Sequence, residues 1–91
     1  MLMMTTYRTK SFMSKEETKR MMDAFVEHGT SEGTIAHYVF ADGGGGVVIG
    51  EYADLGAGYR NILNYGEWVE YEDTPLLSID DALPHIMDAL S

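Results

Sequence analysis

Two stretches around a run of glycines decide the fold: Thr34-Ile-Ala-His-Tyr-Val-Phe-Ala41 and Val47-Val-Ile-Gly-Glu-Tyr52. Both are rich in β-branched and aromatic residues, which predicts strands, and the Asp42-Gly43 pair between them predicts a hairpin turn. In each strand both alternating sets of side chains are largely apolar. A sheet with one solvated face alternates apolar with polar residues, so two apolar faces predict two buried faces. We expect a second copy of the chain to cover the face that its few helices leave bare.

Length and composition predict one folded domain over residues 1–91. The chain has 45% hydrophobic residues, no cysteine and no apolar run near the roughly 20 residues needed to cross a bilayer. We therefore expect no disulfide and no membrane partner, and we expect a cytoplasmic protein. The formal charge of −9 repels phosphate backbones, which argues against nucleic-acid binding.

Helix and strand signals flank the hairpin on both sides. Residues 1–10 read as a strand, and Ser14 with Glu17 predicts a capping box for a helix that ends at His28 before Gly29. Asp54 is the expected cap of a second helix, which several glycines should make short, and residues 68–74 read as a fourth strand. Ser78 then caps a C-terminal helical segment.

The order of these elements predicts an α+β fold, the ferredoxin-like βαββαβ arrangement with a C-terminal helical extension. Right-handed crossovers give an antiparallel sheet with the first and third strands in the centre and both main helices on one face. The first strand then neighbours the fourth, which brings Arg8 and Lys10 near Glu70 and Glu72. The Pro84-containing extension carries an apolar stripe, and we expect this stripe to be buried on its own subunit or against a partner. The stripe consists of Leu83, Ile86, Met87 and Leu90.

Several motifs together resemble a known superfamily. They are Ala41-Asp42-Gly43, Val48-Ile-Gly-Glu51, the segment from Tyr59 to Trp68, and Tyr71-Glu-Asp-Thr-Pro-Leu-Leu77. On these motifs nearly the whole chain resembles the dimeric α+β barrel superfamily. Within it, the chain is similar to a family of short domains of unknown function related to the cofactor-independent, antibiotic-biosynthesis-type monooxygenases. The resemblance implies a homodimer whose two sheets pack face to face around a central cavity.

The sequence predicts neither a phosphate-binding loop nor a metal site. The glycine run Asp42-Gly-Gly-Gly-Gly46 precedes a strand and has no lysine nearby, so it is better explained as a hairpin than as a phosphate loop. The three histidines are isolated from one another and lack the spacing of metal ligands, so we expect no metal and no cofactor. His37 lies mid-strand among apolar residues. We expect it to be a half-buried packing residue that is hydrogen-bonded across the dimer interface, with general-base catalysis as the alternative.

Aromatic and amide side chains offer a candidate ligand site. Such residues suit a small, mostly apolar ligand, and the resembled oxygenases use comparable cavities to position aromatic substrates. We therefore expect a homodimeric protein that binds a small apolar or aromatic ligand or serves a structural role, and is not an enzyme. The alternatives are a cofactor-independent monooxygenase or isomerase of a small aromatic or polyketide-like substrate, and a partner-binding accessory protein. The candidate ligand-binding residues are Tyr38, Tyr52, Tyr59, Asn61, Asn64 and Trp68.

Overall fold

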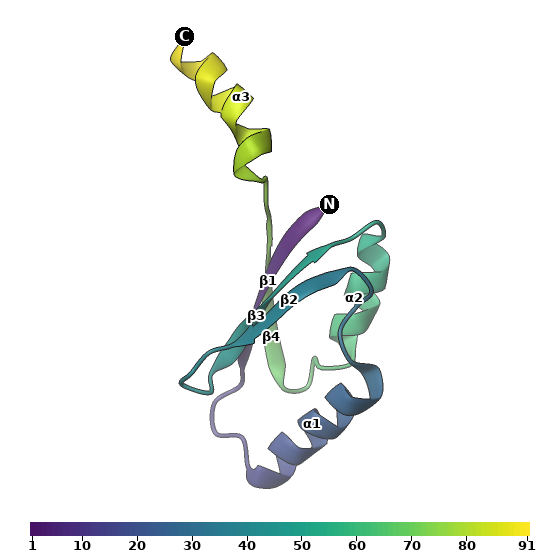
Figure 1. The fold of residues 1–91 in the computed structure, drawn as a ribbon. Helices are drawn as coiled ribbons and strands as arrows, with labels where there is room; N and C mark the ends of the chain where they lie inside the picture. Colours follow the sequence, from purple (N-terminus) through teal and green to yellow (C-terminus); the bar gives the residue numbers. More distant parts are fainter.

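The chain folds as four strands and three helices in the predicted order (Figure 1). The computed structural model describes all residues from 1 to 91. The elements are β1 (Leu2–Thr9), α1 (Lys15–His28), β2 (Thr34–Val39), β3 (Gly45–Glu51), α2 (Leu55–Leu63), β4 (Val69–Pro75) and α3 (Ile79–Leu90).

The four strands form one open, antiparallel sheet in the order β2-β3-β1-β4. The central position of β1 and β3 agrees with the prediction, and the α+β architecture is compatible with a ferredoxin-like fold. The prediction that Arg8 lies near Glu70 is also confirmed, since the two residues pair across β1 and β4. The guanidinium of Arg8, however, lies over the Phe40 ring at 5.5 Å.

The register divides the sheet into two faces. Tyr7 on β1 lies opposite Gly46 on β3 and Tyr71 on β4, and this face is turned toward α1 and α2. The side chains of alternate residues, such as Met4 and its partner Ile49, point to the other face, which neither helix covers (Figure 1). We call this second side the open face. Its apolar side chains are Leu2, Met4, Ala36, Tyr38, Phe40, Val47, Ile49 and Leu76.

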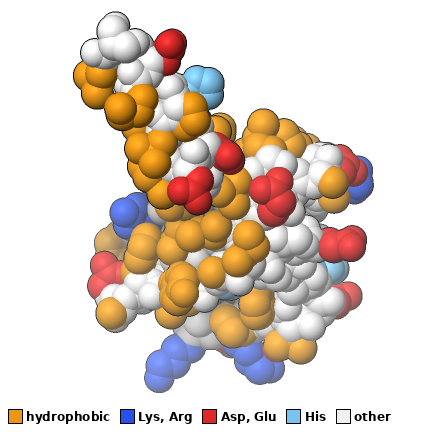
Figure 2. Space-filling model, turned by 45° about the horizontal axis from the view of Figure 1, so that its top comes forward, with side chains coloured by type: hydrophobic (Ala, Val, Ile, Leu, Met, Phe, Trp, Pro, Cys, Tyr) orange, Lys and Arg blue, Asp and Glu red, His pale blue; other side chains and the backbone are white.

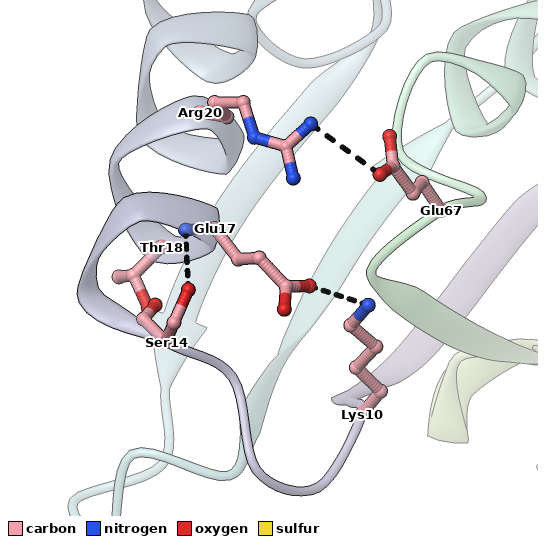
Figure 3. Close-up of polar contacts among 6 residues, drawn as sticks. All are labelled: Lys10, Ser14, Glu17, Thr18, Arg20 and Glu67. Atoms are coloured by element: carbon pink, nitrogen blue, oxygen red, sulfur yellow. Dashed lines mark hydrogen bonds and ion pairs between the residues drawn. The ribbon is translucent and has the colours of Figure 1, made fainter.

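The start of α1 is fixed by its cap and by two ion pairs (Figure 3). The Ser14 hydroxyl accepts from the Glu17 amide at 3.0 Å, as the capping motif predicts. The carboxylate of Glu17 does not reach back to the Ser14 amide. It binds Lys10 at 2.5 Å, and this hydrogen bond lowers the pKa of Glu17. Farther along the helix, Arg20 pairs with Glu67 at 3.6 Å, so α1 is tied to both the end of β1 and the loop before β4.

The hairpin differs from the prediction at its boundaries. β3 begins at Gly45 and β2 ends at Val39, so part of the glycine run belongs to the sheet. The turn closes because the Asp42 carboxylate accepts from the Gly44 amide at 2.8 Å and because Gly43 has a φ of 78°.

The C-terminal helix α3 projects away from the sheet (Figure 1). The amide of Leu76 still donates to the carbonyl of Leu2 at 2.9 Å, and after Leu77 the helix begins directly at its cap, Ser78. Pro84 lies inside the helix. The connection from β4 to α3 stays extended and makes no turn, so α3 does not fold back onto its own sheet. The apolar stripe is therefore not buried on its own subunit, which was one of the two expected places.

The single chain has an unusually large surface. Only 6 of its 91 residues are buried, and its radius of gyration is 16.0 Å, against about 12 Å expected for a compact domain of this length. A small core and a projecting helix leave many apolar side chains in contact with water.

The cap of α1 gives a first prediction. Ser14→Ala should lower the free energy of unfolding by about 1 kcal/mol, because the Glu17 amide loses its acceptor. Urea unfolding followed by circular dichroism measures this change, and Ser11→Ala in the preceding turn is the matched control. Equal stability of the two variants would contradict the assigned cap.

Candidate functional site

A cavity of about 200 Å³ lies between the sheet and helices α1 and α2. The residues that line it come from all four strands and both helices, so the cavity belongs to one subunit, and it is half open to solvent. The resemblance implied a cavity between two sheets, on the other side. The apolar part of the lining is formed mainly by Met21, Met22, Phe25, Val39, Val48, Ile62 and Val69.

A tyrosine–histidine pair supplies one polar element of the cavity. The hydroxyl of Tyr7 and Nε2 of His37 share a hydrogen bond of 2.6 Å, in which the phenol donates when the imidazole proton is on Nδ1. The ring of Phe25 meets the imidazole edge-on at a centroid distance of 5.9 Å. His37 is therefore held by groups of its own subunit, whereas we expected a hydrogen bond across the interface.

Gly46 makes room for this pair. It lies opposite Tyr7 in the register, and a Cβ at this position would come within 2.5 Å of the Tyr7 hydroxyl oxygen and 2.7 Å of the adjoining ring carbon. It would also collide with the carbonyl oxygen of Tyr38. A glycine is needed here because the phenol ring lies over the backbone of β3.

A second polar element lies on β4. Tyr71 is the β4 partner of Tyr7, and the two rings lie 6.4 Å apart. Burial raises the pKa of Tyr71, with smaller contributions from Tyr65, Tyr7 and Asp73. Near the same edge, the Thr5 hydroxyl donates to the Asp73 carboxylate at 2.6 Å. The cavity thus has neutral phenol groups along one wall.

One side chain of α2 and one from the turn that follows it close the end of the cavity next to α1. The hydroxyl of Tyr65 and the amide of Asn61 both donate to the carbonyl oxygen of Gly29, at 2.7 and 3.3 Å. Gly29 has a φ of 64° and ends α1, as predicted. The carbonyl that the helix end leaves free is therefore satisfied by α2, which fixes the two helices relative to each other.

The structure brings together three of the residues selected from the sequence and separates the others. His37, Tyr52 and Asn61 line the cavity. Tyr38 is on the open face and Tyr59 on the outer side of α2, exposed by 64% and 62%. The side chain of Asn64 is also exposed.

Trp68 is buried but does not line the cavity. Its Nε1 is enclosed without a hydrogen-bond partner. Ligand binding by any of these residues stays a prediction.

Sequence reasoning missed Tyr7, Tyr65 and Tyr71. The sequence held a signal for Tyr7 and Tyr71. Their strands are predicted neighbours, and pairing these strands puts the two side chains on the same face of the sheet. Tyr65 follows the last turn of α2, where helical periodicity no longer predicts the direction of a side chain.

Comparison with protein families gives one result. A family model described as a domain of unknown function (DUF3303) matches residues 1–90. The chain belongs to the DUF3303 family. Comparisons with the curated proteins and with the solved structures gave no match. The description of the DUF3303 family names no activity, so the side chains of this chain are the basis for its chemistry.

The structure of this DUF3303 domain also bears on metal binding and on membrane crossing. No three His, Asp or Glu side chains lie close enough together to hold a metal ion. None of the helices combines the length and apolar character that a membrane crossing requires.

The buried phenols give a prediction for alkaline pH. Burial raises the pKa of Tyr7, Tyr65 and Tyr71, so the folded state favours their neutral forms. Their contribution to stability is fully present below the unfolded pKa of about 10 and is lost as the pH rises through the higher folded values. Ultraviolet absorbance during a pH titration should show late-ionising tyrosines. Tyr71→Phe should remove a late component; a single transition for all six tyrosines would contradict the assignment.

Proposed function

We propose that the protein binds a small aromatic or largely apolar molecule between its sheet and helices α1 and α2. The observation that supports this proposal is the half-open cavity of about 200 Å³, which gathers apolar side chains from the sheet and from both helices around one concave space. Its walls combine apolar side chains with a few polar groups, the usual composition of a small-molecule site.

The size and polarity of the cavity define the class of ligand. An engineered apolar cavity of about 150 Å³ accepts benzene, so this cavity is large enough for a single substituted ring. The Tyr7–His37 pair and the Tyr71 hydroxyl offer hydrogen bonds to one polar substituent. No cationic side chain lines the cavity, so a neutral ligand fits better than an anion.

Phenol is a suitable first probe of this proposal. Two-dimensional NMR should show saturable shifts at cavity residues in the full-length protein. Ile62→Trp should abolish them, because Ile62 lines the cavity and the larger side chain fills it. Leu63→Trp is the matched control, since the next residue on α2 is exposed and should leave binding unchanged. Absence of saturable binding, or equal binding by both variants, would overturn the proposal.

Catalysis is the second candidate function, and the Tyr7–His37 hydrogen bond is the observation that favours it. An imidazole next to a phenol in a mostly apolar cavity has the groups needed to move a proton to or from a bound substrate. A cofactor-independent monooxygenase or isomerase of a small aromatic substrate would use them in this way.

His37→Gln separates binding from catalysis. For a binding protein this variant should keep its affinity for phenol and lose about 1 kcal/mol of stability through the altered hydrogen bond to Tyr7. For an enzyme, turnover of a substrate found by screening should fall by about 10²–10⁴-fold. We expect the first result. Tyr52→Phe, which changes another cavity residue, is the control.

We further propose that the protein is a homodimer in which the open faces of two sheets meet. The support is the apolar part of this face on β2, β3 and the start of β1, which α1 and α2 leave uncovered; its β4 side carries Glu70 and Glu72. Face-to-face packing of two sheets at about 10 Å would remove these side chains from water.

Ile49→Glu tests this dimer. Light scattering of the wild-type chain should give about twice its mass of 10.1 kDa. The substitution puts a charge in the middle of the open face and should raise the dissociation constant by at least about 100-fold. Leu63→Glu adds the same charge on exposed α2 and should leave the mass unchanged. A wild-type monomer would refute the proposed dimer.

A further inference from the structure

Helix α3 is amphipathic but packs on nothing within its own chain. Its polar residues share one side, while the other side carries a continuous apolar stripe whose members are all exposed. An amphipathic helix of this kind is stable only when its apolar side is covered. The stripe consists of Ile79, Leu83, Ile86, Met87 and Leu90.

The surface of the whole chain points to a partner of considerable size. The chain exposes 6715 Å², about 1,400 Å² more than the roughly 5,300 Å² expected for a folded monomer of 10.1 kDa. Burying that excess on each of two copies would give an interface of about 2,800 Å², which is in the range of obligate homodimers.

The chain's own sheet is a poor place for α3. Leu76 is still hydrogen-bonded to Leu2, and Ser78 is already the helix cap, so a reversal onto the open face would have to occur within about two residues. The four-stranded sheet is also about 19 Å wide, whereas a helix covers about 10 Å. A helix folded back would therefore leave much of the apolar face bare.

Charge indicates where on a second copy the helix fits. α3 carries three acids and no Lys or Arg, so two α3 helices placed side by side would repel each other. The opposite end of the molecule, where β1 leads into α1, carries Arg8, Lys15 and Lys19, and its two acids are Glu16 and the Lys10-paired Glu17. Phe12 lies in the same loop with its side chain fully exposed. Figure 2 shows hydrophobic side chains along the projecting helix and on the neighbouring face of the body, with Lys and Arg at the far end and also at both sides of the body.

We propose that α3 is an exchanged arm that docks its apolar stripe on a second copy of this chain. It binds at the end of that copy where Phe12 and the basic residues lie, and it receives the other copy's α3 in return. A two-fold axis perpendicular to the strands produces this arrangement, because it puts the α3 end of each copy against the β1–α1 end of the other. The inference rests on the proposed homodimer and adds where α3 of each copy binds within it.

Photo-crosslinking tests the arm directly. The full chain is prepared with p-benzoylphenylalanine in place of Met87, and ¹⁵N-labelled and unlabelled protein are mixed before irradiation. Mass spectrometry of the cross-linked peptides should show labelled–unlabelled pairs that join α3 to residues 8–14 of the other chain.

Three results would overturn the inference: cross-links only within one chain, cross-links that join the two α3 helices, and a dimer that forms no cross-link from α3. A wild-type monomer would refute the sheet dimer as well, so the two failures can be told apart. A monomer that acquires cross-links only in a cell extract would instead indicate a different protein as the partner.

A pair of charge variants checks the contribution of the stripe. Leu83→Glu with Ile86→Glu should raise the dissociation constant at least about 100-fold, because both side chains leave the docked stripe. His85→Glu with Ala89→Glu changes the charge by the same amount away from the stripe and should have little effect. Two-dimensional NMR signals from the central strands β1 and β3 verify that the body remains folded in both proteins. Equal dissociation constants for the two variants would contradict the proposal.

Discussion

The structure depends on a sheet that carries apolar side chains on both sides and has helices on only one of them; β4 adds the acids Glu70 and Glu72 to the uncovered side. β1 and β3 occupy the centre of the sheet, so their side chains are far from both edges and need cover above and below. Helices α1 and α2 cover the side of Tyr7 and Val48. The side of Met4 and Ile49 has no cover in one chain. The proposed dimer and the proposed docking of α3 would both cover apolar side chains that a single chain leaves exposed.

The cavity on the covered side has a related origin. A sheet and two short helices meet there, and several positions that large side chains would fill are occupied by glycine, threonine or valine. Gly46 leaves room for the Tyr7 ring, and the ring in turn directs its hydroxyl to His37. The space that remains is bordered by phenols, which are uncharged at neutral pH, and burial raises their pKa values further. A small domain that keeps such a space gives up packing energy, and ligand binding is the function that we propose for it.

Local signals predicted most of the fold. Ser14, Asp54 and Ser78 cap the three helices, and Gly29 ends the first of them, because these effects act within one turn of chain. The order of the strands followed from handedness and alternation alone. The composition of the cavity was harder to predict. Tyr7 and Tyr71 become neighbours only through pairing of distant strands, and the aromatic residues Tyr38 and Tyr59 were selected by type although they point away from the cavity. The direction of α3 was also beyond local rules, since it depends on what covers the helix.

The central claim is that one chain leaves its core incomplete and a second copy completes it. The dependence of thermal unfolding on protein concentration tests this claim most directly. If folding and association are coupled, a hundredfold rise in concentration stabilises the dimer by about 2.7 kcal/mol, and the melting temperature rises accordingly. The account predicts a steady rise between about 1 and 100 μM. A melting temperature that is the same over this range would show that the single chain is stable alone, and it would contradict the account.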